Sequence, residues 1–211
     1  MRLCQLVTAV TLLFVSLSAF AETPKALATA PEKVSPLLNG MEIPNVTVKD
    51  AEGAPFSLQA LIMQKPSIVL FYRGGWCPYC SRQLAGLKDI EQDLVNTGYQ
   101  ILAISPQSPA QLQKQKLETK MAVKLLSDES LAAVTGFGVG YYLDSATQAR
   151  YQGHGVSLTT DSTGKGVLPA PSLFFLDTAG VVQMSYVNPD FKVRPSSELV
   201  LAIAQALAKQ Q

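Results

Sequence analysis

The chain has 211 residues, and its 17 Lys and Arg against 16 Asp and Glu give a net charge of +1. This length suits one domain with a sizeable core, or one domain with an insertion. The charge balance lacks the basic excess that nucleic acid or an anionic membrane surface requires, so neither is expected as a partner.

The first 21 residues have the pattern of a removable export leader: Arg2, an apolar run from about Leu6, and the small-x-small cleavage site Ala19-Phe20-Ala21. The leader holds one cation and no acid, so its removal leaves a net charge of zero. If the leader were not cleaved, it would act as a membrane anchor. After the leader, no apolar run approaches the roughly 20 residues that span a bilayer. We therefore predict a periplasmic protein that begins near Glu22, with no stable membrane insertion after leader removal.

The start of the mature chain differs in composition from the rest. Residues 22–36 are mostly Ala, Pro, Lys, Thr and Glu, which predicts a flexible N-terminal segment before a domain over 37–211. Two short runs separated by turn-forming residues predict a small β-hairpin over 46–58. A short helix is expected over 58–63.

A buried strand precedes the two cysteines. Residues 67–72 form a continuous apolar run between Pro66 and Gly74, as in a strand buried on both faces. We expect this to be a central strand of the sheet. The cysteines follow it directly, and apolar residues then recur at helical spacing until Gly98 ends the helix.

Strands and helices continue to alternate, which predicts an α/β fold whose sheet has parallel pairs and right-handed crossovers. The expected elements are a strand over 99–105, a helix over 109–119, a strand over 124–127 and a helix over 129–135.

A glycine-rich insertion, about 136–168, interrupts this alternation and is expected to hold a short helix over 145–151. A late hairpin follows over 171–187. The last helix is predicted over 196–209, and its core stripe is expected to consist of Leu199, Ile203, Ala206 and Leu207.

The cysteine count points to redox chemistry. Of the three cysteines, Cys4 lies in the leader, so Cys77 and Cys80 are the thiols of the mature protein. A crosslink between residues three positions apart closes a loop too short to stabilise the fold much. Tetrahedral zinc needs four ligands, and the mature chain adds only His154 to the two thiols. A reactive dithiol remains, with no metal and no cofactor expected.

The predicted position of the pair suits a reactive thiolate. At a helix N-terminus, unpaired N–H groups and the aligned peptide dipoles favour negative charge, so a cysteine there has a lowered pKa. Pro78 fits the first helical turn, which needs no N–H from it. The pair can therefore carry out thiol–disulfide exchange or attack another electrophile such as a peroxide.

The order of motifs resembles the thioredoxin fold. The run from Phe71 to Cys80, with Leu168-Pro169-Ala170-Pro171 and the run 187–191 downstream, is similar to the peroxiredoxin-like branch of the AhpC/TSA family. The resemblance covers about Leu37 to Leu207. It implies a central mixed β-sheet flanked by helices, here with an N-terminal hairpin extension and an insertion before the late hairpin.

The same resemblance implies a substrate-binding surface around the dithiol. It places Pro171 at the thioredoxin-fold cis-proline, which faces the thiols and presents backbone groups to a bound substrate. Trp76, Tyr79 and Arg73 are expected to join Pro78 and Pro171 in contacting substrate.

The sequence also departs from the family pattern. Typical peroxiredoxins carry P-x-x-x-T-x-x-C, so Cys80 takes the peroxidatic position, Cys77 replaces the Thr and Arg73 replaces the Pro. Pro171 stands where many of these enzymes have an Arg. Because disulfide exchange needs neither missing group, the leading interpretation is an exported thiol–disulfide oxidoreductase in which Cys77, expected to be the more exposed thiol, attacks and Cys80 resolves.

Two alternatives stay open. The first is a thiol peroxidase that reduces hydroperoxides with Cys80 as the peroxidatic cysteine. The second is a copper chaperone that uses Cys77, Cys80 and His154 as soft ligands for Cu(I). The expected partners are protein disulfides or dithiols, or a peroxide, together with a thiol electron donor or acceptor such as a membrane thiol carrier.

Overall fold

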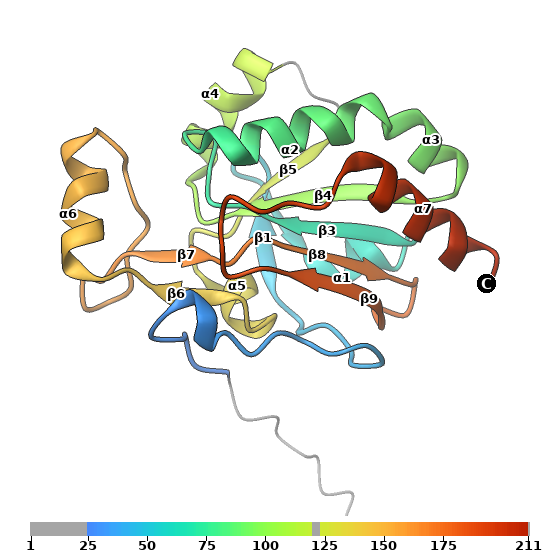
Figure 1. Cartoon of the computed structure of the whole chain (residues 1–211), viewed down its shortest axis with the longest axis horizontal. Helices are drawn as coiled ribbons and strands as arrows, with labels where there is room; N and C mark the ends of the chain where they lie inside the picture. Colours follow the sequence, from blue (N-terminus) through green and yellow to red (C-terminus); the bar gives the residue numbers. More distant parts are fainter. Residues whose placement is uncertain (1–24, 120–122, 211) are drawn as a thin grey trace, which may run out of the picture.

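The structure is a computed structural model, and it describes residues 25–119 and 123–210. Its main feature is a seven-stranded mixed sheet with the strand order β2-β1-β5-β4-β3-β8-β9 (Figure 1). The strands of this sheet are β1 (Thr47–Lys49), β2 (Pro55–Ser57), β3 (Ser67–Phe71), β4 (Gln100–Ser105), β5 (Lys124–Ser127), β8 (Ser172–Leu176) and β9 (Val182–Val187).

Helices cover both faces of the sheet, so the domain has three layers (Figure 1). On one face lie α2 (Pro78–Asp89), α3 (Glu91–Asn96), α4 (Pro109–Thr119) and α7 (Ser197–Ala208), and on the other lie α1 (Leu58–Ile62) and α5 (Ala132–Gly136). No helix in the described ranges is long and apolar enough to cross a membrane.

Strand β3 is central, as the sequence predicts. It runs parallel to β4 and antiparallel to β8, and all five of its residues are buried. Val69 and Phe71 pack into the core on the α1 and α5 side, whereas Ile68 and Leu70 pack under α2 and α7. This alternation follows from the two-residue period of a strand, and it anchors the segment that leads to the cysteines in both halves of the core.

Two helices differ from the prediction. The helix expected to run to Gly98 ends at Asp89, and Ile90, at φ −106° and ψ 9°, separates α2 from α3. The core stripe of α7 is also only partly as predicted. Val200 and Ala204 are its buried positions, and Ile203 and Leu207 pack against the same cluster as expected, whereas Leu199 is 49% exposed and Ala206 is exposed.

The N-terminal segment corrects the expectation of flexibility over 22–36. Residues 22–24 lie outside the described residues, but 25–36 pack against the insertion. The N–H of Ala28 donates to the carbonyl of Gly140 at 3.0 Å, and the N–H of Tyr142 donates to the carbonyl of Ala28 at 2.9 Å. Residues Pro31–Lys33 form a 3₁₀ turn. The segment is ordered because its backbone pairs with β6 of the insertion.

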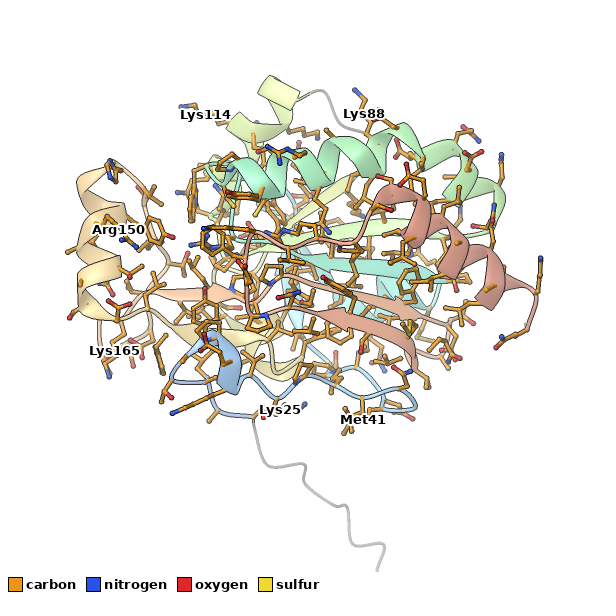
Figure 2. All side chains as sticks on the ribbon, in the orientation of Figure 1. Lys25, Met41, Lys88, Lys114, Arg150 and Lys165 are labelled. Atoms are coloured by element: carbon orange, nitrogen blue, oxygen red, sulfur yellow. The ribbon has the colours of Figure 1, made fainter. Side chains whose placement is uncertain are left out.

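The insertion is structured. Strands β6 (Gly140–Tyr142) and β7 (Val167–Pro169) form a small antiparallel sheet. The predicted helix is present as α6 (Ser145–Gly153), and Asp144 caps it by accepting from the N–H of Thr147. Helix α6 stands beyond one end of the large sheet (Figure 1). Arg150, labelled in Figure 2, belongs to this helix.

Gly138 tests whether the N-terminal segment is part of the folded domain. Its φ is +68°, and a Cβ there would lie 2.0 Å from the Ser35 carbonyl oxygen. Gly155→Ala is the matched control, because Gly155 has φ +75° and nothing lies within 4 Å of its added Cβ. We expect Gly138→Ala to lower the free energy of unfolding by about 1–3 kcal/mol more than the control, since it adds a clash to the same left-handed strain.

Urea unfolding followed by tryptophan fluorescence measures both variants. Equal losses in the two variants would mean that residues 25–36 do not pack on the insertion in solution.

Candidate active site

The cysteines lie where β3 passes into α2. Cys77 is the N-cap of α2 and Pro78 is its first residue, so both thiols belong to the first helical turn, as predicted. Gly74, at φ +144°, allows the Trp76 side chain to lie close to the backbone of this turn. A Cβ at Gly74 would lie 2.5 Å from the Trp76 indole nitrogen. The buried strand therefore delivers the dithiol to a helix N-terminus that favours negative charge.

Both cysteines are free thiols and both are buried, at 1% exposure for Cys77 and 0% for Cys80. Cys77, which is expected to be the more exposed thiol, is covered almost as completely as Cys80. Trp76, which precedes the motif, and Tyr79, which lies between the two cysteines, are half-buried and pack against the same core cluster as the thiols. The dithiol is therefore covered on the reduced protein.

The two sulfurs share a proton through a hydrogen bond. This bond is the main cause that lowers the pKa of Cys77, against the opposing effect of burial, and the Cys80 N–H and the charges of Arg73 and Arg194 lower it further. The same bond, together with burial, raises the pKa of Cys80. The pair loses its first proton as a unit. It therefore holds one negative charge more readily than an isolated thiol does.

Arg194 is a residue of the site that the sequence does not predict. Its Nη2 donates to the Cys80 sulfur at 3.4 Å. It lies between β9 and α7, in a segment without a periodic pattern. It also lines a pocket of about 440 Å³ between α2 and the start of α7, with Tyr79 and Arg82 on the α2 side. Cys80 itself does not line this pocket, so Arg194 is the residue that connects the pocket to the Cys80 sulfur.

Arg73 lies under the motif and is only 3% exposed. Its guanidinium carbon is 4.2 Å from the centre of the Phe191 ring, 5.1 Å from that of Trp76 and 5.2 Å from that of Tyr151. We call these three rings the aromatic cage. Cation–π attraction of this kind contributes about 0.5–2 kcal/mol for each ring.

Tyr151 also accepts a hydrogen bond from Arg73 Nη2. Burial lowers the pKa of Arg73, but this bond and neighbouring groups raise it above its ordinary value, so the residue stays a cation. Neither Tyr151 nor Phe191 is predicted at the site. Tyr151 lies in the short helix of the insertion, and Phe191 ends the run 187–191, which supports the family resemblance but indicates no role for this residue.

The predicted substrate-contacting residues come together, with one correction. Pro78 is exposed, and Tyr79 packs edge-on against Phe191 with ring centres 5.7 Å apart. Pro171 precedes β8 beside the exit of β3, but no peptide bond among the described residues is cis, so the expected cis-proline is wrong. Two backbone hydrogen bonds hold the segment before β8 in place. The Ala170 N–H donates to the Val139 carbonyl, and the Asn188 N–H donates to the Pro171 carbonyl.

The copper alternative does not fit this geometry. His154 is exposed at the C-terminal end of α6. Within residues 25–119 and 123–210, no group of three or more His, Cys, Asp or Glu side chains is placed to hold a metal ion. The set of Cys77, Cys80 and His154 that a chaperone would require is therefore not formed.

Comparison with known proteins agrees with the redox geometry. The model of the AhpC/TSA family matches residues 40–185. Peroxiredoxin Bcp of Escherichia coli (strain K12) is 30% identical over 133 residues, which cover 63% of this chain and 84% of that protein. The chain belongs to the AhpC/TSA family. Chloroplastic peroxiredoxin Q of Sedum lineare is 28% identical over 168 residues, 80% of this chain and 78% of that protein.

Solved structures of peroxiredoxins share the fold. Peroxiredoxin Q of Xanthomonas campestris matches with a TM-score of 0.63 and 19% identity over 81% of this chain and 98% of its own. The BcpB peroxidoxin of Mycobacterium tuberculosis matches with a TM-score of 0.63 and 18% identity over 82% of this chain and 96% of its own. The thioredoxin-like α/β fold with a central mixed sheet is thus confirmed, and this family member is an oxidoreductase.

Arg194→Met tests whether the arginine stabilises the thiolate. The variant keeps an apolar stem but loses the donor to Cys80 and one positive charge. We expect the pKa of the pair to rise, and the rate of iodoacetamide alkylation at about pH 6 to fall about three- to tenfold, because a rise of one pKa unit removes about nine-tenths of the thiolate below the pKa.

The matched control is Arg82→Met. Arg82 lines the same pocket but is exposed, and its guanidinium carbon lies 5.8 Å from the centre of the Tyr79 ring. An equal slowing in both variants would show that the overall charge of the pocket, and not the Arg194 contact, sets the acidity.

Proposed function

We propose that the protein is a thiol peroxidase that reduces hydroperoxides with the dithiol of Cys77 and Cys80. Curated relatives at 26–30% identity are named peroxiredoxins. A similar solved structure is that of a reduced peroxiredoxin of Vibrio vulnificus in complex with hydrogen peroxide. These names favour the peroxidase alternative over the leading interpretation of a disulfide oxidoreductase.

The observation that carries this proposal is the contact of Arg194 with the Cys80 sulfur. The sequence favours disulfide exchange because the chain lacks the Thr and the Arg of typical peroxiredoxins. Arg194 supplies a fixed cation at the sulfur that takes the peroxidatic position. A preorganised donor of this kind stabilises the charge that develops as the O–O bond breaks.

The first step requires a thiolate on Cys80. The shared proton moves across the hydrogen bond to Cys77, which leaves Cys80 negative beside Arg194. Cys80 then attacks the outer oxygen of the hydroperoxide, so that a sulfur–oxygen bond forms and the O–O bond breaks. Cys80 becomes a sulfenic acid, and the leaving alkoxide takes the proton from Cys77 to become an alcohol.

The second step resolves this intermediate within the same helical turn. The Cys77 thiolate attacks the sulfenic sulfur, a disulfide forms and hydroxide leaves. The dithiol has then lost two electrons, and the hydroperoxide has become an alcohol and hydroxide. An external thiol donor returns the disulfide to the dithiol. Cys77 thus provides the proton of the first step and the nucleophile of the second.

Export belongs to the same proposal. The leader over 1–21 lies outside the described residues, so its support is the cleavage pattern in the sequence. In the periplasm the electron donor would be a thiol carrier of the membrane or of the envelope. Intact-mass measurement of the protein from the envelope fraction should give a chain that begins near Glu22. A mass that includes Met1 to Ala21 would contradict export with cleavage.

Single serine variants separate the roles of the two cysteines. With excess hydrogen peroxide or an organic hydroperoxide, Cys77→Ser should form a sulfenic acid on Cys80, detected by dimedone labelling and mass spectrometry. Cys80→Ser should lose peroxide consumption by about a hundredfold or more, since the remaining thiol lacks the Arg194 contact.

The lowered pKa of Cys77 favours the second candidate, thiol–disulfide exchange, in which Cys77 attacks a protein disulfide. In that case Cys80→Ser would keep a fast-alkylating thiol and trap a lasting mixed disulfide with an oxidised protein. Cys77→Ser would then be inert to peroxide, and the peroxidase assignment would be wrong.

A further inference from the structure

The insertion contributes a residue to the redox site. Tyr151 lies on α6, which belongs to the segment that interrupts the regular alternation of strands and helices. Its ring lies 5.2 Å from the ring of Trp76, beside the cysteine motif, and its hydroxyl accepts from Arg73 Nη2. One side chain therefore connects α6 to both the motif and the buried cation.

Arg73 is a buried charge without an acidic partner. The ion pairs of the described residues are Lys49–Glu129 and Lys116–Glu52, and Arg73 belongs to neither. Its Nε is buried without a hydrogen-bond partner in the described part of the chain. A buried cation normally requires pairing or hydrogen bonds. Here the Tyr151 hydroxyl and the rings of the aromatic cage stabilise the buried guanidinium.

The negative charge with which Arg73 interacts is the thiolate of the dithiol. The charge of Arg73 favours ionisation of Cys77, and the backbone N–H of Arg73 does the same for Cys80. The guanidinium is effective only if it stays beside the sulfurs. Its long side chain has many rotamers, so a fixed position requires a specific contact.

We propose that Tyr151 is a positioning residue of the redox centre, whose hydroxyl holds the Arg73 guanidinium beside the dithiol. The proposal rests on the dithiol being the reactive centre of the proposed function, and not on which electrophile it meets. The insertion is then part of the active site.

The other charged and titratable groups around the pair have different roles. Arg194 contacts Cys80 directly from the segment before α7. Tyr72, on the chain leaving β3, donates its hydroxyl to Gln115, and Tyr141 on β6 interacts with Arg73 through charge alone. Tyr151 is the tyrosine whose hydroxyl binds the guanidinium, so the expected effect is specific to it.

Removal of this hydroxyl would leave Arg73 Nη2 without its acceptor. An unsatisfied buried donor costs about 1–3 kcal/mol, and more when it is charged. The guanidinium would then shift toward water and away from the sulfurs. The positive potential at Cys77 would fall, and the dithiol would ionise at higher pH.

The experiment measures the iodoacetamide alkylation rate of the reduced, full-length mature protein as a function of pH. Tyr151→Phe should move the midpoint of this profile to higher pH and lower the rate at about pH 6 about three- to tenfold. The matched control is Tyr142→Phe, because Tyr142 belongs to the same insertion but lies outside the cage. Its profile should coincide with that of the unmodified protein.

A double-variant cycle separates positioning from a merely structural role. If Tyr151 acts through Arg73, then Tyr151→Phe should shift the midpoint no further in an Arg73→Met background. A Tyr151→Phe shift that persists in this background would overturn the proposal, and so would a rate that falls equally at every pH without a midpoint shift. Thermal unfolding of each variant shows whether the fold is retained.

The result is independent of the peroxidase test. Alkylation uses no peroxide, so a lack of sulfenic acid on Cys80 would refute the proposed reaction and leave the role of Tyr151 standing. Conversely, unchanged alkylation in Tyr151→Phe would refute the positioning role while peroxide consumption by the dithiol continued.

Discussion

The site depends on one constraint: a negative charge must exist on a sulfur that water does not reach. Both cysteines are buried, and burial alone raises the pKa of a thiol. The structure counters this effect by local donors, namely the first turn of α2, a hydrogen bond between the sulfurs, and the cations Arg73 and Arg194. The aromatic cage and the Tyr151 contact follow from the need to keep a second buried charge in place.

The central strand makes this arrangement possible. Because β3 pairs with β4 on one side and β8 on the other, its last residues cannot shift, and the turn at Gly74 starts from a fixed point. The cations come from different parts of the chain, one from the end of this strand and one from the segment after β9. The thiolate of the dithiol thus interacts with one cation from the middle of the sequence and one from its C-terminal part.

Most of the fold could be predicted from local pattern. Continuous apolar runs marked β3 and β8, and the apolar spacing marked the helix after Cys80, because these signals reflect burial at fixed periods. The site could be predicted only where it is contiguous, from Arg73 to Cys80. Arg194 and Tyr151 reach it through tertiary packing, which leaves no period in the sequence. The composition of the N-terminal segment predicts flexibility. Its order comes from backbone pairing with β6, which composition does not show.

The electrostatics also bear on what happens after oxidation. A disulfide carries no charge, so its formation removes the anion that offsets Arg73 and Arg194, while both cations stay in place. Groups that stabilise a thiolate stabilise the reduced state relative to the disulfide, which makes the disulfide more oxidising and easier to reduce. A peroxidase must be re-reduced in every cycle, and peroxide is a strong enough oxidant to form even a disfavoured disulfide. The same two arginines would therefore assist both halves of the cycle, by activating the thiolate before oxidation and by favouring its return afterwards.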